Sequence, residues 1–272
     1  MRCRLARPRA VYVLAALALW GCGTFARRPA EWPASGTNPS DVVARFYSRA
    51  NSVRSLRALA KLRYTDPRER YSSRQAIAVE RPNRIRVEVT TMLGTAFVLA
   101  AQDHRLAAYW PDEQTFFEGT ATAENLWRYT RLWMPVETLV DVLLAVPGAR
   151  QSELATCPQA ADRYVCLRHA GAGQGGLLVA LDARGVPAEV EEQSAIDGSV
   201  LWRARYLEYT AERPLAPQHL VIEVPRYRRS VVLQLSEVEL NPRLDPDVFL
   251  IPRPPAARVV DLDEVETEEV PQ

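Results

Sequence analysis

The chain has 272 residues, with 34 Lys and Arg against 33 Asp and Glu, and 47% of its residues are hydrophobic. This length suffices for one large β domain or two small ones. The near-neutral charge differs from the clustered basic surface that nucleic-acid binding requires, so we expect no nucleic-acid partner.

The N-terminus has the three parts of an export signal. Four Arg residues precede the apolar run Val11–Trp20, and the small residue Gly21 follows it. About ten apolar residues are too few to span a bilayer, which needs roughly twenty. Residues 1–21 are therefore predicted to be a cleaved signal peptide. Their removal leaves 30 basic against 33 acidic residues, a mature net charge of about −3.

The segment Leu19-Trp20-Gly21-Cys22 resembles the bacterial lipobox. The resemblance implies that Cys22 is acylated and becomes the new N-terminus; an ordinary secreted protein with a stray Cys is the alternative. Each buried CH₂ of an acyl chain contributes roughly 0.8 kcal/mol to membrane binding. Gly23, rather than Asp, follows the Cys, which implies the outer membrane. Residues 22–39 are rich in Pro and Gly and are predicted to form a flexible tether.

Two Cys residues remain, Cys157 and Cys166, in a segment that is typical of a hairpin. In an oxidising periplasm a cross-strand disulfide is the expected state. A metal site is the alternative, but the sequence offers no second Cys pair or nearby His pair as further ligands. We therefore expect no metal and no cofactor.

A helix is predicted from an N-cap at Ser40 to Ala50, because apolar residues recur there at helical spacing. From Leu56 the apolar residues alternate with period two, which indicates half-buried antiparallel strands. Short turns join these strands in a meander, since a parallel sheet would need crossover helices.

Two helices are predicted within residues 122–146, the first capped by Thr122 and the second beginning at Pro135. The second is strongly amphipathic. Strands resume after residue 147 and run to 240. Phe249 and Ile251 are predicted to dock on the domain. Residues 256–272 are acidic and nearly free of aromatic residues, so we expect a disordered tail.

The sequence contains few candidates for catalytic chemistry. His104, His169 and His219 are isolated and are interpreted as surface or core residues. The segment 171–176 matches GxGxxG, but a strand follows it instead of the helix that would bind a pyrophosphate, so we interpret it as a hairpin loop. Arg226, with its basic neighbours, could meet anionic lipid headgroups; a solvated turn is the favoured alternative. We predict that the protein is not an enzyme.

Many antiparallel strands with one apolar face are expected to curl, and the amphipathic helices can cover the concave side. An incompletely filled half-barrel would leave a hydrophobic cavity suited to acyl chains. An ordinary packed core is the alternative.

The lipobox, first helix, meander, apolar Leu-Gly turn and the pattern P-x-x-x-L-x-x-x-L-L-x-x-P at 135–147 resemble the LolB family of outer-membrane lipoproteins, within the LolA/LolB superfamily. The likeness covers residues 40 to 252. It implies a mainly β fold with α, in which a curved antiparallel half-barrel of about eleven strands is covered by helices that enclose a hydrophobic cavity. The predicted domain spans residues 40–255. The Cys pair and the acidic tail depart from the family pattern.

The resemblance also implies the function and the sites. A LolB protein accepts acylated lipoproteins from a periplasmic carrier like LolA and inserts them into the outer membrane. We therefore expect a monomer that is lipid-anchored, faces the periplasm and contacts membrane lipid. The predicted membrane-insertion loop is Met92, Leu93 and Gly94, with Leu93 at the exposed Leu of that family; the alternative is a tip folded back on its own strands. The predicted acyl-cavity lining is Val87, Phe97, Leu99, Leu139, Val140, Leu143 and Leu144. A lipid-binding carrier, or a structural component of an envelope complex, is the alternative function.

Overall fold

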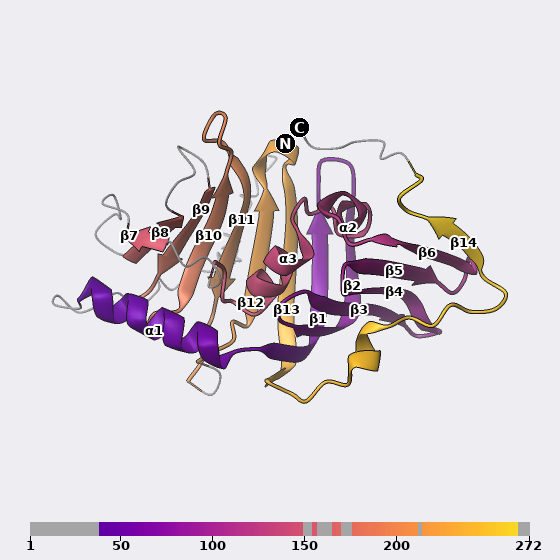
Figure 1. Ribbon diagram of the computed structural model, residues 1–272, viewed down its shortest axis with the longest axis horizontal. Coiled ribbons are helices and arrows are strands. Elements are labelled where there is room, and N and C mark those ends of the chain that lie inside the picture. Colours follow the sequence, from indigo (N-terminus) through magenta and orange to yellow (C-terminus); the bar gives the residue numbers. More distant parts are fainter. Residues whose placement is uncertain (1–37, 149–153, 157–164, 170–175, 212–213, 266–272) are drawn as a thin grey trace, which may run out of the picture.

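The computed structural model describes residues 38–148, 154–156, 165–169, 176–211 and 214–265 (Figure 1). The helices are α1 (Pro39–Ser52), α2 (Ala123–Thr130) and α3 (Val136–Leu143), with short 3₁₀ turns η1 (Pro225–Tyr227) and η2 (Pro246–Phe249).

The first group of strands comprises β1 (Ser55–Thr65), β2 (Arg70–Glu80), β3 (Arg84–Thr91), β4 (Gly94–Gln102), β5 (Arg105–Trp110) and β6 (Thr115–Thr120). The second comprises β7 (Leu154–Thr156), β8 (Val165–His169), β9 (Gly176–Leu181), β10 (Pro187–Gln193), β11 (Val200–Leu207), β12 (His219–Val224) and β13 (Arg229–Leu240). A last strand, β14 (Arg258–Asp261), follows η2.

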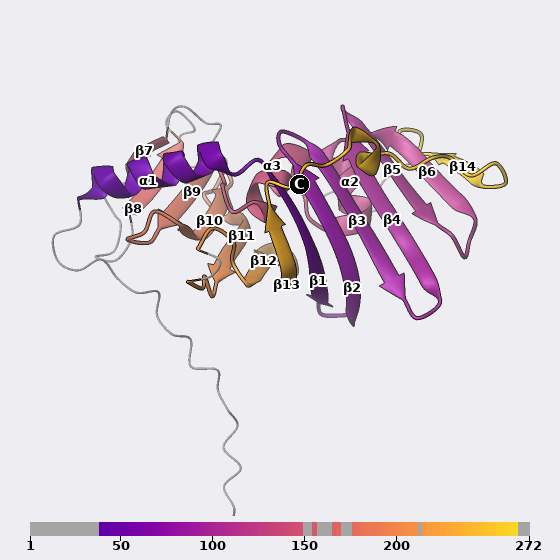
Figure 2. The same cartoon turned by 90° about the horizontal axis from the view of Figure 1, so that it is seen from below.

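One curved sheet contains all of these strands, in the order β14-β6-β5-β4-β3-β2-β1-β13-β12-β11-β10-β9-β8-β7 (Figures 1 and 2). The two meanders join at its centre, where β13 returns to pair with β1 in antiparallel register from Thr65↔Ser230 to Leu56↔Leu240. The predicted mainly β fold with an antiparallel half-barrel is confirmed. The described sheet has fourteen strands instead of about eleven, because the β7–β8 hairpin and β14 extend its two edges.

The period-two pattern translates directly into burial. On β1, Leu56, Ala58 and Ala60 are buried on the concave face, whereas Arg57 and Lys61 are exposed on the convex face. A strand directs successive side chains to opposite faces, so a sheet with this pattern has one apolar side. Helices α2 and α3, which connect the two meanders, lie over that side (Figure 1), and α3 contacts β2 and β3.

Helix α1 begins earlier than predicted. Asn38, not Ser40, is its N-cap, and the Asn38 side chain accepts a hydrogen bond of 3.0 Å from the Ser40 backbone nitrogen. Pro39 fits the first helical position because its missing N–H needs no partner there. The helix packs on β8 and β9 at the far end of the sheet (Figures 1 and 2). Gly185 permits this approach, since a Cβ at that position would lie 2.7 Å from the Val42 carbonyl oxygen.

Helix α2 begins as predicted, with Thr122 accepting a hydrogen bond of 3.1 Å from the Asn125 backbone nitrogen. Helix α3 begins at Val136, one residue after Pro135, which occupies the N-cap. In the part of the chain that is described, no helix is long and apolar enough to cross a membrane. Phe249 docks on the domain as predicted and is 2% exposed, and Ile251 is half-buried.

The prediction of a disordered tail over 256–272 is wrong for its first part. Residues 258–261 form β14, which pairs in parallel with β6, and Leu262 is only 3% exposed. Asp263 accepts hydrogen bonds from the Thr120 hydroxyl at 2.8 Å and from the Asn125 side-chain nitrogen at 2.7 Å. The acidic composition misled the prediction because these carboxylates are used for bonding while Leu262 enters the core. Residues 266–272 lie outside the described residues.

Candidate functional site

A cavity of about 420 Å³ lies between the concave face of the sheet and the segment α2–α3. Strands β1 to β5 supply one wall, β12 and β13 contribute the adjoining part, and residues 128–143 cover it. Most of its lining is apolar, so its interior favours hydrocarbon over water. A volume of this size falls within the range of about 300–1,000 Å³ that small-molecule pockets occupy.

Five of the seven residues predicted to line an acyl cavity border this one, namely Val87, Phe97, Leu99, Leu139 and Leu143. Val140 and Leu144 do not; they are 0% and 1% exposed and pack in the core. The sequence could not separate them, because α3 is apolar on more than one face and even Val142 is fully buried. Amphipathic spacing therefore identified the helix but not which of its faces borders the cavity.

Aromatic side chains form one end of the cavity wall. The rings of Phe97 and Trp110 are 4.3 Å apart between centroids, and Tyr129 of α2 lies 5.8 Å from Phe97 and 5.5 Å from Trp110. Burial raises the pKa of Tyr129, so its hydroxyl stays neutral at physiological pH. This cluster connects the helix to β4 and β5 and gives the cavity a rigid, weakly polar wall.

The cavity lining is more polar and more exposed where β2 begins. Tyr71 is 47% exposed and stacks on Tyr64, with ring centroids 4.9 Å apart. The Tyr64 hydroxyl donates to Asp66 at 2.9 Å, and burial with this hydrogen bond raises the pKa of Tyr64 to about 12. Glu69 and Arg131, both exposed, also border the cavity here. These residues form what we call the polar mouth of the cavity: Glu69, Tyr71 and Arg131.

The β3–β4 hairpin carries the predicted insertion loop at its tip. Met92 and Leu93 form the two-residue turn and are 105% and 100% exposed, so the tip is not folded back on its strands. The Thr91 hydroxyl fixes the turn by donating to the Gly94 carbonyl at 3.1 Å and accepting from the Leu93 nitrogen at 3.2 Å. Gly94 has φ +121°, which a residue with a side chain adopts at a cost. The geometry holds two large apolar side chains in solvent.

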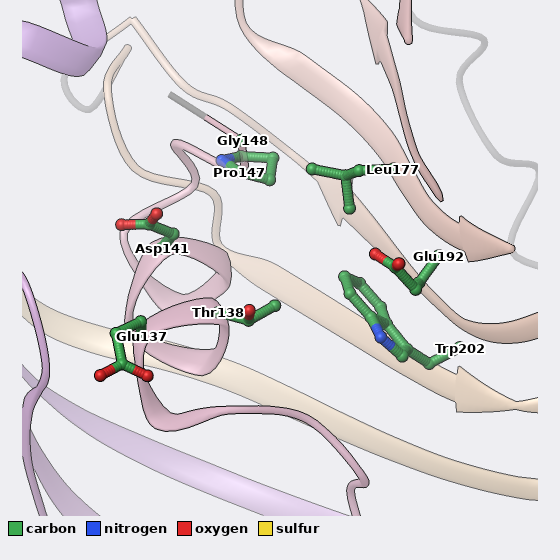
Figure 3. Close-up of a pocket in the computed structure, with 8 residues that line it drawn as sticks. All are labelled: Glu137, Thr138, Asp141, Pro147, Gly148, Leu177, Glu192 and Trp202. Atoms are coloured by element: carbon green, nitrogen blue, oxygen red, sulfur yellow. The ribbon is translucent and has the colours of Figure 1, made fainter. Parts of the chain in front are cut away.

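A second, more polar cleft of about 220 Å³ lies on the other side of α3 (Figure 3). Figure 3 shows Glu192 beside the Trp202 indole, with the carboxylates of Glu137 and Asp141 directed away from them. Asp141 is ion-paired with Arg81 at 3.2 Å. Within the described ranges no group of acidic, His or Cys side chains could hold a metal ion.

Several predicted sites lie wholly or partly outside the described residues. Cys22, with the whole of residues 1–37, and Cys157 lie outside the described residues; Cys166 lies in β8, so the lipid attachment and the disulfide stay predictions. Most of the 171–176 loop is also outside, but a strand, β9, does follow it.

The three predicted non-functional His residues are dispersed in the fold. His104 is exposed in the β4–β5 turn, and His219 on β12 contacts Glu208 at 3.1 Å between Nδ1 and a carboxylate oxygen. The side chain of His169 is not described. Arg226 lies in η1, on a turn as expected, 6.0 Å from the centre of the Tyr227 ring.

Sequence reasoning missed most of the lining, including the polar mouth. The signal that could have found the strand residues of the lining, Tyr71 included, is the inward-facing register of the strands. Once Val87 was assigned to the concave face, the same alternation would assign further residues of the pocket to it: Leu62, Tyr64, Tyr71, Ser73, Gln75, Ile77, Ile85, Val89, Ile222, Val231 and Leu233.

The architecture is similar to that of a LolA superfamily protein from Nitrosomonas europaea, with a TM-score of 0.54 and 12% identity, covering 77% of this chain and 97% of that one. A domain of an outer membrane lipoprotein-sorting protein from Vibrio parahaemolyticus gives a TM-score of 0.53 at 11% identity, covering 78% and 97% of the two chains. The protein has the LolA-like fold.

A DUF1329 family protein from Desulfovibrio piger shares this LolA-like fold, with a TM-score of 0.51 and 8% identity over 78% of this chain and 95% of that one. No family model matches the sequence, and no curated relative matches it either. At identities of 8–12%, the likeness concerns the fold.

Proposed function

We propose that this protein is a non-enzymatic envelope lipoprotein that binds acyl chains in the cavity under α2 and α3. In its finer form, the proposal is that it accepts acylated lipoproteins from a LolA-like periplasmic carrier and inserts them into the outer membrane, to which the acylated Cys22 anchors it. The observation that carries the proposal is the combination of an apolar cavity with an exposed apolar tip on the same hairpin.

The hairpin connects the two features physically. Val89 and Phe97 border the cavity, and Met92 lies three residues beyond Val89 on the same strand and turn. At about 3.3 Å per residue, the tip extends roughly 10 Å past the cavity wall. Burying a Met or Leu side chain in the bilayer would stabilise the bound state by roughly 1.5–3 kcal/mol each. A membrane-bound tip would therefore bring the cavity close to the lipid into which cargo must pass.

No covalent step is required in this mechanism. Cargo chains leave a weaker carrier site, enter a cavity lined by side chains such as Val87 and Leu139, and then leave for the bilayer, each step running downhill in free energy. The similarity to an outer membrane lipoprotein-sorting protein domain supports an envelope role of this kind. The alternative is a lipid carrier on the same fold. The polar mouth beside an apolar cavity supports this alternative, because a lipid has both a polar headgroup and apolar chains.

The test is transfer of labelled cargo. The chain from residue 23 onward, with its fold verified by circular dichroism, is mixed with a LolA-like carrier loaded with a radiolabelled lipoprotein. We expect the label to move to this protein. If it stays on the carrier while the cavity still binds a fluorescent fatty acid, the insertion role is wrong and acyl-chain binding alone stands.

A further inference from the structure

The cavity wall formed by β2 changes in polarity along its length. Four alternate residues of this strand, Tyr71, Ser73, Gln75 and Ile77, border the cavity. Tyr71 is 47% exposed, the next two are half-buried, and Ile77 is 3% exposed. An amphiphile would therefore lie with its hydrocarbon chains near Ile77 and its polar group near Tyr71.

Charges of both signs meet at the polar mouth. Glu69, Tyr71 and Arg131 all border the cavity. Burial raises the pKa of the Tyr71 hydroxyl, Glu69 and Asp66 add to the rise, and Arg131 opposes it. Within the described part of the chain Arg131 has no ion pair. Arg128, which also borders the cavity, is by contrast held by Asn125 at 3.3 Å and by the Val265 carbonyl oxygen.

The backbone at Arg131 is fixed. This residue is the C-cap of α2 with φ +57°, and its N–H donates to the Trp127 carbonyl oxygen. The Thr130 hydroxyl donates to the Leu126 carbonyl oxygen at 2.9 Å and accepts from the Leu132 nitrogen at 3.1 Å. The mouth thus carries a guanidinium without an ion pair on a fixed backbone position, and a fixed attachment point lowers the entropy cost of binding an anionic group.

We propose that the polar mouth recognises the headgroup of a zwitterionic glycerophospholipid whose acyl chains occupy the cavity. The Arg131 guanidinium binds the phosphate through charge-assisted hydrogen bonds, and the Glu69 carboxylate binds the ammonium group. The inference rests on the proposed binding of acyl chains but not on lipoprotein insertion. It names a ligand class distinct from an acylated Cys, which presents no phosphate at the mouth.

Charge complementarity favours a zwitterionic phospholipid over neutral and anionic lipids. A neutral diacylglycerol would leave both charges without a partner, and a purely anionic headgroup would meet the Glu69 carboxylate. A zwitterion satisfies both residues at once, and its phosphate and ammonium groups are a few bonds apart, as suits two side chains that border the same mouth.

The experiment is calorimetric titration of the full-length protein in a non-ionic detergent with three soluble probes: dihexanoyl-phosphatidylethanolamine, dihexanoylglycerol and glycerophosphoethanolamine. We expect the phospholipid to bind most tightly. R131Q and E69Q should each weaken it by about tenfold, the loss of one charged hydrogen bond, and leave dihexanoylglycerol unchanged. The matched control R63Q removes an exposed Arg from the outward face of β1 and should change neither affinity.

The outcomes separate the two proposals. If both lipids bind equally and R131Q changes neither, headgroup recognition is wrong while acyl-chain binding stands. If glycerophosphoethanolamine binds as tightly as the phospholipid, the mouth is a site for a free phosphate compound and the lipid assignment is overturned. If neither lipid binds to the folded protein, the proposed binding of acyl chains is itself wrong, and the inference falls with it.

Discussion

Arg49 is a buried cation that connects three separate parts of the chain. It is 5% exposed in α1, and its guanidinium donates to the carbonyl oxygens of Ala145, after α3, and Leu215, before β12. Burial lowers the pKa of Arg49, while the nearby Tyr209, Tyr206 and Asp182 oppose that shift. The side chain thus attaches α1 to the segment that follows α3 and to the segment that precedes β12.

Replacing Arg49 by Met should lower the free energy of unfolding by about 1.5–3 kcal/mol, because the buried Ala145 carbonyl group and the part-buried Leu215 carbonyl group lose a charged donor. Urea unfolding followed by circular dichroism measures this change. The control is R45M, one turn earlier, since Arg45 is exposed and donates only to the Ala183 carbonyl oxygen, at 2.8 Å, among its described hydrogen bonds. Equal destabilisation by the two substitutions would show that Arg49 has no special structural role.

At the scale of secondary-structure elements, alternation predicted the strands well because one face of each is buried. Strand β3 shows this alternation, with Ile85 and Val87 on the concave face. Edge strand β14 was missed because it is short, begins an otherwise acidic tail and pairs with a strand far away in sequence. The polar mouth was missed for a related reason: Arg131 enters the site through a left-handed C-cap, and local sequence does not specify its tertiary neighbours.

The β14 segment offers a test at this scale. Leu262→Ala should release the strand, since removing a buried Leu side chain costs about 2–5 kcal/mol and this short element has few other apolar contacts. Hydrogen exchange should then accelerate at the amides of Arg258 and Leu262, which donate to the Gln114 and Glu118 carbonyl oxygens at 2.8 Å.

The control for this test is Val259→Ala within β14, where the side chain is 41% exposed and little apolar contact is lost. It should leave the exchange rates near those of the unchanged protein. Continued protection of the two amides in the Leu262→Ala protein would mean that Asp263, through Thr120 and Asn125, suffices to hold the segment.

At the scale of the whole molecule, the meander places alternate turns at the same end of the strands. The turns after β1, β3 and β5 share one end of the antiparallel ladder, and the pairing of β13 with β1 adds the turns after β12 and β10 to that end. The Met92–Leu93 tip and the turn with Ile196, which is 98% exposed, therefore both lie at this end of the ladder. The hairpin of the Met92–Leu93 tip borders the cavity, whereas Ile196 does not, so matched substitutions in the two turns can be compared.

Leu93→Glu should weaken binding of the chain from residue 23 onward to phospholipid vesicles by about tenfold or more, because a charge replaces a side chain whose burial contributes roughly 1.5–3 kcal/mol. Vesicle flotation measures the bound fraction without the lipid anchor. Ile196→Glu makes the same chemical change at an equally exposed turn outside the cavity wall, so it should have a much smaller effect. Equal losses would indicate that all of the turns at this end of the ladder contact the bilayer. Unchanged binding in the Leu93→Glu protein would remove the tip from the mechanism. Because Leu93 has no contact in the core, neither result can be attributed to unfolding once the melting temperatures agree.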